Sequence, residues 1–131
     1  MTAIEKIRKK LESYPTVKFS VNGNTISVEP VAADGFTVCL VERKPGFTVG
    51  YDGWHEEFED EEEALSAFAF GLSDECRLKV VQRGEMDCSW TVEAREGDGW
   101  SEDSTTGLLL TPFWKKKRVV YRQNRVLENG K

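Results

Sequence analysis

Short segments rich in β-branched and aromatic residues, each closed by a turn signal, recur along most of this sequence. Residues 16–21 (TVKFSV) and 25–31 (TISVEPV) flank Asn-Gly-Asn, and Asn-Gly is the strongest short-range signal for a β-hairpin. Residues 36–43 (FTVCLVER) and 47–51 (FTVGY) flank Lys-Pro-Gly, which is a second turn signal. This spacing predicts four antiparallel strands in the first half of the chain.

The third of these predicted strands is apolar on both faces. Phe36, Val38 and Leu40 alternate on one face, whereas Cys39 and Val41 lie on the other. A strand with apolar side chains on both faces is usually covered on both sides. We therefore expect this strand to be central in its sheet.

The N-terminal residues carry helical signals. Thr2 and Glu5 have the spacing of a capping box, and Pro15 disfavours helical geometry at the residue before it. These signals predict a helix over residues 3–13. Its apolar stripe consists of Ile4, Ile7, Leu11 and Tyr14.

A second helix is predicted at residues 61–70, after a run of acidic residues. Asp60 is a favourable N-cap, and carboxylates in the first turn interact favourably with the helix dipole. Leu65, Phe68 and Leu72 follow at positions i, i+3 and i+7, so they share one face. We expect this face to pack on the sheet.

Strand patterns return in the second half of the chain. Residues 77–84 (RLKVVQRG), 89–96 (SWTVEARE), 108–114 (LLLTPFW) and 118–127 (RVVYRQNRVL) are predicted as strands. The polar residues 97–107 (GDGWSEDSTTG) are predicted as a loop that connects two of them.

The expected fold class is α+β, with a mainly antiparallel sheet and the order α-ββββ-α-ββββ. Two short helices cannot cover both faces of a large sheet, so we expect them on one side. A length of 131 residues fits a single domain over 1–131. The repeated order suggests an internal pseudo-repeat with halves 1–58 and 59–131, in which Gly23 and Gly84 end the first strand of each half.

Targeting and cysteine signals indicate a cytoplasmic protein. The first residues, MTAIEKIRKKLESYP, lack the apolar core of a signal peptide, and no apolar run approaches the ~18 residues of a membrane helix. Cys39, Cys76 and Cys88 are odd in number and have the spacing of neither a disulfide framework nor a zinc site. We expect three reduced thiols.

His55 is the only histidine, and it lies among acidic residues that suggest a catalytic or metal site. Along an extended segment, Glu56 would lie on the face opposite to His55, Glu57 and Glu59, so the carboxylates are divided. The chain also lacks phosphate-loop, lipase-like and zinc-protease motifs. We therefore predict no catalytic residue, metal or cofactor and favour a non-enzyme. A small-molecule-binding or hydrolytic domain that uses His55 and these carboxylates is the alternative.

The C-terminal residues 112–131 contain seven basic residues and one acidic residue, although the whole chain has a net charge of −5. Basic and aromatic residues together are typical of single-strand nucleic-acid binding, but a pI near 5.0 opposes it. Interfacial membrane binding by residues 108–114 would require an exposed apolar face. We expect neither nucleic-acid binding nor a membrane span.

The residues fit best a non-catalytic protein-interaction domain of the adaptor or chaperone-like kind. Small size, acidity and mixed α/β order are similar to those of cytosolic chaperones of secreted effectors, an analogy that no motif carries. The expected partner is another protein or a second copy. The acidic run 56–63 and the basic residues 115–125 have opposite charge, so they would pair either within the fold or across a homodimer interface. The candidate binding residues are Trp54, His55, Trp100, Phe113, Trp114, Arg122 and Arg125.

Overall fold

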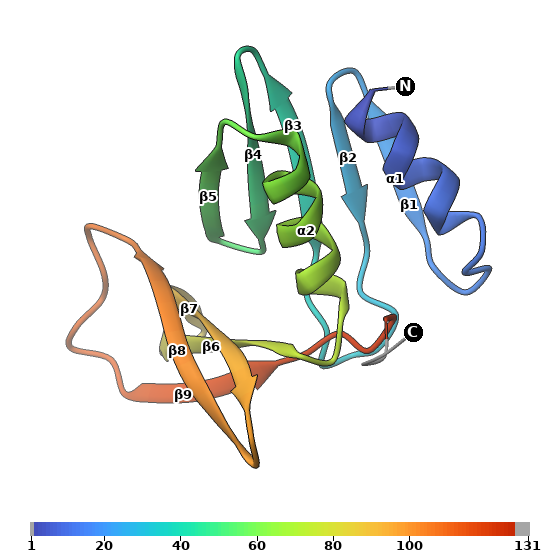
Figure 1. The fold of residues 1–131 in the computed structure, drawn as a ribbon. Coiled ribbons are helices and arrows are strands. Elements are labelled where there is room, and N and C mark those ends of the chain that lie inside the picture. The colour runs from blue at the N-terminus through green and yellow to red at the C-terminus, as the bar shows by residue number, and fades with distance from the viewer. Residues whose placement is uncertain (1, 128–131) are drawn as a thin grey trace.

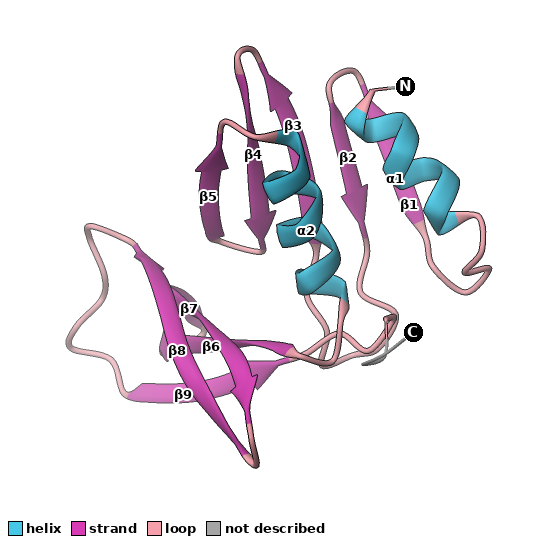
Figure 2. Ribbon diagram, in the orientation of Figure 1, coloured by secondary structure: helices cyan, strands magenta, loops and turns pink. Residues whose placement is uncertain are grey.

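The computed structural model of the protein describes residues 2–127 (Figures 1 and 2). Its first half contains α1 (Ala3–Leu11), β1 (Phe19–Asn22), β2 (Thr25–Val28), β3 (Val38–Arg43), β4 (Gly46–Tyr51) and β5 (Trp54–Phe58). Its second half contains α2 (Glu61–Leu72), β6 (Cys76–Arg83), β7 (Met86–Glu96), β8 (Gly99–Gly107) and β9 (Lys117–Arg122).

The strands form two antiparallel sheets, which confirms the predicted α+β class. One sheet has the order β1-β2-β3-β4-β5 and the other the order β8-β7-β6-β9. Both helices lie on the same face of the five-stranded sheet, as expected (Figure 2). The third strand is central, and the side chains of Val38 and Leu40 have no exposed area. The prediction for that strand is therefore confirmed.

The first half has one strand more than predicted, because residues 54–58 form β5. A tight turn with Asp52 at φ +52° reverses the chain, and Tyr51 then pairs with Trp54. Asp tolerates this left-handed conformation better than most residues. The sequence pattern is weak there because Glu56 interrupts the apolar face between Trp54 and Phe58.

Two predictions for the second half are wrong: a segment predicted as a loop is a strand, and the segment after it, predicted as a strand, is a loop. The polar residues 99–107 form β8, whereas residues 108–114, predicted as a strand, form turns and irregular structure. β8 is an edge strand, so its Ser, Thr and Glu side chains stay in contact with solvent and no apolar pattern is required. Pro112 lacks the N–H that a ladder position needs.

The helix predictions are confirmed with shifted ends. Thr2 and Glu5 form the capping box, and α1 ends at Leu11, before the predicted boundary at residue 13. The Asp60 side chain accepts a hydrogen bond from the Glu63 N–H, and α2 continues to Leu72. Ile4, Ile7 and Leu11 of α1 are buried, as are Phe68 and Leu72 of α2. Leu65, which was expected on the same face, is only partly buried and lines the groove between the helices.

The segment that follows β9 connects the two halves of the chain. β9 ends at Arg122, before the predicted boundary at 127, because the Gln123 N–H donates to the Asp34 carbonyl at 2.8 Å. The buried Asn124 side chain then accepts from the Phe36 N–H at 3.2 Å and donates to the carbonyls of Phe36 and Gly71, both at 3.0 Å. These bonds hold the C-terminal segment between elements of the first half and α2.

The two halves that the sequence suggested as a pseudo-repeat have the same topology in their first three strands. β1–β3 and β6–β8 are both antiparallel meanders, and Gly23 and Gly84 have φ of +61° and +63° in their first turns. Glycine adopts this conformation at no steric cost. The fourth strands differ, because β4 lies beside β3 whereas β9 returns to pair with β6.

Candidate functional site

His55 lies exposed on β5. Its backbone N–H donates to the Thr106 hydroxyl at 3.4 Å, and it lines neither of the two main hollows of the described chain. The Asp52 carboxylate nearby in sequence is bound to Arg122 and to the Thr37 N–H. Among residues 2–127, no group of three or more His, Cys, Asp and Glu side chains is placed to hold a metal ion.

Trp54, a candidate binding residue, belongs to the core. Its side chain is 4% exposed, its ring stacks on Tyr51 with centroids 4.5 Å apart, and its Nε1 donates to the Ser104 hydroxyl at 3.0 Å. A buried tryptophan with a satisfied N–H needs no ligand. The residue joins β5 to β8 and does not present a surface to a partner.

The two candidate arginines make intramolecular ion pairs. Arg122 Nη1 lies 2.8 Å from Asp52 Oδ2 and 2.9 Å from Asp87 Oδ2, so this guanidinium links the turn after β4 to β7. Arg125 Nη1 lies 3.4 Å from Asp34 Oδ2 in an exposed pair. Exposed pairs of this kind contribute little, in the range of about 0–1 kcal/mol. Arg122, by contrast, has a structural role, because its two pairs link the turn after β4 to β7.

Trp100 takes part in a layer of rings and guanidinium groups on the outer face of the four-stranded sheet. The Arg77 guanidinium lies 4.6 Å from the Trp100 ring centroid and 4.1 Å from that of Tyr121, and Arg95 lies 4.6 Å from Trp100. Arg77 also binds the buried Glu93 carboxylate at 2.5 Å. These contacts occupy the polar groups of the layer, so we assign it to sheet stability.

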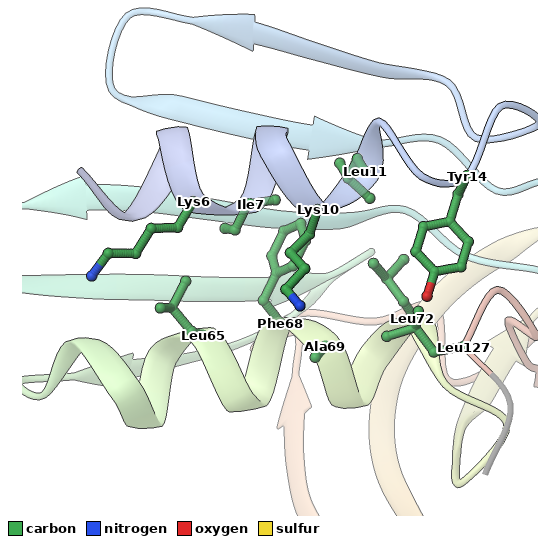
Figure 3. Close-up of a pocket in the computed structure, with 10 residues that line it drawn as sticks. All are labelled: Lys6, Ile7, Lys10, Leu11, Tyr14, Leu65, Phe68, Ala69, Leu72 and Leu127. Carbon is green, nitrogen blue, oxygen red and sulfur yellow. The ribbon is translucent and has the colours of Figure 1, made fainter. Parts of the chain in front are cut away.

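An apolar groove of about 400 Å³ lies between α1 and α2 (Figure 3). Its polar groups are the Tyr14 hydroxyl and the ammonium groups of Lys6 and Lys10, and Lys6 pairs with Glu61. The groove thus lacks a carboxylate, histidine or thiol that would act as base or nucleophile. Its apolar lining consists of Ile7, Leu11, Leu65, Phe68, Ala69, Leu72 and Leu127.

The three cysteines are free thiols, in line with the expectation of reduced cysteines. Cys76 and Cys88 are buried and Cys39 is half-buried. Burial raises the pKa of Cys76 to about 12, so this thiol stays protonated at neutral pH. Since the thiolate is the nucleophilic form, Cys76 is chemically inert.

The most exposed apolar surface lies in the connection between β8 and β9, which stands out at the left of Figure 1, away from the helices. We call residues 108–114 the apolar loop. Its large side chains keep much of their surface in solvent: Leu109 97%, Leu110 84%, Phe113 76%, Trp114 72% and Leu108 42%. Large exposed apolar patches are uncommon on monomeric soluble proteins, which makes the apolar loop a candidate interaction site.

Two backbone hydrogen bonds form turns around Phe113 and Trp114 in the apolar loop. The Phe113 N–H donates to the Thr111 carbonyl at 2.8 Å, and the Lys115 N–H donates to the Pro112 carbonyl at 2.9 Å. The rings of Phe113 and Trp114 meet edge to face, with centroids 5.4 Å apart. Aromatic side chains fixed in this way lose little conformational entropy on binding.

Exposed cations continue directly from the apolar loop. We call Lys115–Arg118 the basic segment, and each of its residues is exposed. Arg118 donates to the Gln82 side-chain oxygen, whereas no ion pair engages Lys115, Lys116 or Lys117 among residues 2–127. The apolar loop and the basic segment together form the candidate site.

The structure brings together only two of the seven candidate residues, Phe113 and Trp114. The other five lie in the core, on the exposed side of β5, on the outer sheet face or in ion pairs. Sequence reasoning missed the exposed leucines, because Leu108, Leu109 and Leu110 fit a buried strand equally well. Pro112, two residues further on, was the signal against that strand.

No protein-family model, curated protein or solved structure matches this chain. The structure describes no helix that is both long enough and apolar enough to cross a bilayer. The chemistry of the apolar loop and the basic segment is therefore the basis on which a function can be argued.

Proposed function

We propose that this chain is a non-catalytic protein-interaction domain, of the adaptor or chaperone-like kind, that docks another protein through the apolar loop. The observation that carries the proposal is the exposure of Leu109, Leu110, Phe113 and Trp114 side by side in sequence. Trp and other aromatic residues are enriched at the energetic centres of protein interfaces.

The apolar loop offers four large apolar side chains that a partner can bury. Full burial of one large apolar side chain contributes about 1.5 to 3 kcal/mol, and four such side chains are available. Association costs about 4 to 15 kcal/mol in lost freedom, depending on the estimate. The apolar loop therefore supplies a large part of the driving force, and polar contacts by the basic segment add to it.

A protein partner fits the charge distribution better than nucleic acid or a lipid surface. The basic segment is small, and the chain as a whole carries a net charge of −5, which disfavours approach to polyanions and anionic bilayers. A protein pocket with an acidic rim matches an apolar loop flanked by lysines. The three free thiols support a cytoplasmic location.

A small-molecule-binding role is the second candidate, and the groove between the helices favours it. Its volume lies within the range of ligand pockets, about 300 to 1,000 Å³. Phe68 and Leu72 on its floor are each 3% exposed, so little apolar surface there still needs a partner. The apolar loop leaves more apolar surface exposed to solvent than the groove does, and we therefore favour protein binding. No hydrogen bond or ion pair links the His55 side chain to a nucleophile in the described part of the chain, so nothing favours hydrolysis.

Replacement of Leu109, Leu110 and Trp114 by serine is expected to remove partner binding and leave the fold intact. The three side chains contribute binding energy only when a partner covers them, so affinity should fall by about 100-fold or more. The measurement is quantitative mass spectrometry of proteins captured from the native cytosol by the wild-type chain and by this variant. Thermal midpoints should agree, because the replaced side chains are exposed.

The matched control is Val31→Ser, which removes an apolar side chain that is 53% exposed elsewhere on the surface. Proteins lost with the loop variant and retained with Val31→Ser support the proposal. Equal capture by all three chains would contradict it. Binding of the wild-type chain to vesicles of phosphatidylserine and phosphatidylcholine, lost in the loop variant, would show that a lipid surface is the ligand instead.

Self-association is the form of the proposal in which the partner is a second copy. No ion pair within residues 2–127 joins the acidic run 56–63 to residues 115–125, since Glu61 pairs with Lys6 and Arg122 with Asp52 and Asp87. A dimer through those charges should weaken between about 0.05 and 1 M salt, whereas a dimer through the apolar loop should persist. Sedimentation equilibrium measures both cases. A 14.9 kDa species throughout would contradict the homodimer and leave another protein as partner.

A further inference from the structure

β9 is an edge strand that follows the apolar loop and begins within the basic segment. It pairs with β6 on one side only, and no described strand lies on its other side. An unpaired strand edge presents backbone N–H and C=O groups that another chain can use. The chain thus places an open hydrogen-bonding edge beside its most exposed apolar side chains.

The hydrogen-bonding phase identifies the groups on this edge. The Gly84 N–H donates to the Lys116 carbonyl at 3.1 Å, immediately before β9 begins. Bonded and non-bonded pairs alternate along an antiparallel ladder. The backbone groups of Lys117, Val119 and Tyr121 therefore point away from β6 and toward the open edge. No described backbone group binds the amides of these residues.

The positive charge of β9 limits which kind of strand can pair with its open edge. β9 has the sequence KRVVYR, without an acidic residue. Its Arg122 is paired with Asp52 and Asp87, whereas the four cations of the basic segment make no ion pair among residues 2–127. Two copies of β9 paired antiparallel would place lysine and arginine side chains close together, which is unfavourable for like charges across strands. An acidic strand satisfies the same positions favourably. A second copy of β9 is therefore the wrong occupant for this edge.

We infer that the partner presents an extended acidic segment, which adds a strand to the open edge of β9 while its flanking apolar residues contact the apolar loop. The inference rests on the proposed function and specifies how it is carried out. Main-chain hydrogen bonds supply affinity in this mode of recognition, and alternate side chains supply specificity.

Val119→Pro is the decisive variant, because it removes an N–H from the open edge and leaves the β6 side of the ladder intact. Proline is tolerated in edge strands where the missing N–H faces solvent. Val119→Thr keeps both the N–H and the β-branched shape, so it is the matched control. Circular dichroism and thermal midpoints establish that both variants are folded.

The probe is a fluorescent eight-residue peptide of alternating Glu and Val, measured by fluorescence anisotropy. We expect it to bind the wild-type chain and Val119→Thr, and to bind Val119→Pro at least about tenfold more weakly. The same peptide with Lys in place of Glu should bind at least about tenfold more weakly to the wild-type chain. A peptide N-methylated at alternate residues on its pairing edge should not bind, and this arm needs no variant of the protein.

Absence of binding by the Glu-Val peptide, equal binding by Val119→Pro, or undiminished binding of the N-methylated peptide would each overturn the edge inference. The proposed function has a separate readout, which is capture that depends on Leu109, Leu110 and Trp114. If Val119→Pro captures the loop-dependent proteins as well as Val119→Thr does, the edge inference fails and the role of the apolar loop stands. If loop-dependent capture is absent, the proposed function itself fails.

Discussion

Replacement of Phe68 by alanine is expected to lower the free energy of unfolding by about 3 to 5 kcal/mol. The Phe68 side chain is 3% exposed and lies on the floor of the groove between α1 and α2, within the main cluster of buried residues. Its truncation removes apolar contacts and leaves a cavity that two packed helices cannot fill. Urea denaturation followed by tryptophan fluorescence measures the change.

Leu65→Ala is the control for this result, since Leu65 lies on the same helix and is only partly buried. Leu65→Ala should lower the free energy of unfolding by clearly less than Phe68→Ala does. An unchanged denaturation midpoint for Phe68→Ala would contradict the packing of α2 on the sheet. Phe68 also lines the groove. If Phe68→Ala lowers stability but still captures the partner, then Phe68 serves the core and partner binding belongs to the apolar loop.

Replacement of Asn124 by alanine is expected to cost about 3 kcal/mol or more. Asn124 is 4% exposed, and its side chain makes three hydrogen bonds to backbone groups of Phe36 and Gly71. The variant leaves these buried groups without partners, and each unsatisfied group costs about 1 to 3 kcal/mol. The expected result is a large fall in the urea midpoint at an unchanged m-value.

Arg125→Ala is the matched control for Asn124→Ala, because it removes an exposed side chain at the next position. Arg125 pairs with Asp34 at 3.4 Å and with the Gln123 side chain, and both contacts are exposed. Its replacement should change stability by less than about 1 kcal/mol. Equal effects of the two variants would show that the C-terminal segment is not held by Asn124.

Local signals were sufficient to predict most of the elements. The capping residues Thr2 and Asp60 set both helix starts, and the Asn-Gly and Lys-Pro-Gly turns set the first two hairpins. Each of these features depends on residues three or four positions apart, which a sequence displays directly. The central position of β3 followed from its two apolar faces.

The errors have a common physical cause, which is that strand pairing depends on distant residues. β8 is polar and forms because β7 offers a partner edge, and a Thr91–Thr105 hydroxyl contact at 2.7 Å lies across the pair. Leu108, Leu109 and Leu110 are as apolar as a core strand, yet they lie outside the described strands, and it is the Leu108 N–H that bonds to β7, at the Cys88 carbonyl (2.9 Å). Sequence periodicity shows the polarity of successive side chains, but it does not show whether a partner strand is available.

The candidate site was predictable only in part. Phe113 and Trp114 were identified from the mixture of aromatic and basic residues, and they are exposed. Trp54 was another aromatic candidate, in an acidic stretch, and it is buried, because an aromatic side chain suits a core and an interface equally. The separation of the two cases required the burial of each side chain, which depends on the whole fold.

The most direct test of the central claim is photo-crosslinking from the apolar loop inside cells of the native host. A photoreactive phenylalanine replaces Phe113 in one chain and Val31 in a control chain, both of which are exposed positions. The account predicts a discrete protein adduct from position 113 that position 31 does not give. No protein adduct at position 113, or the same adducts from both positions, would contradict protein binding through the apolar loop.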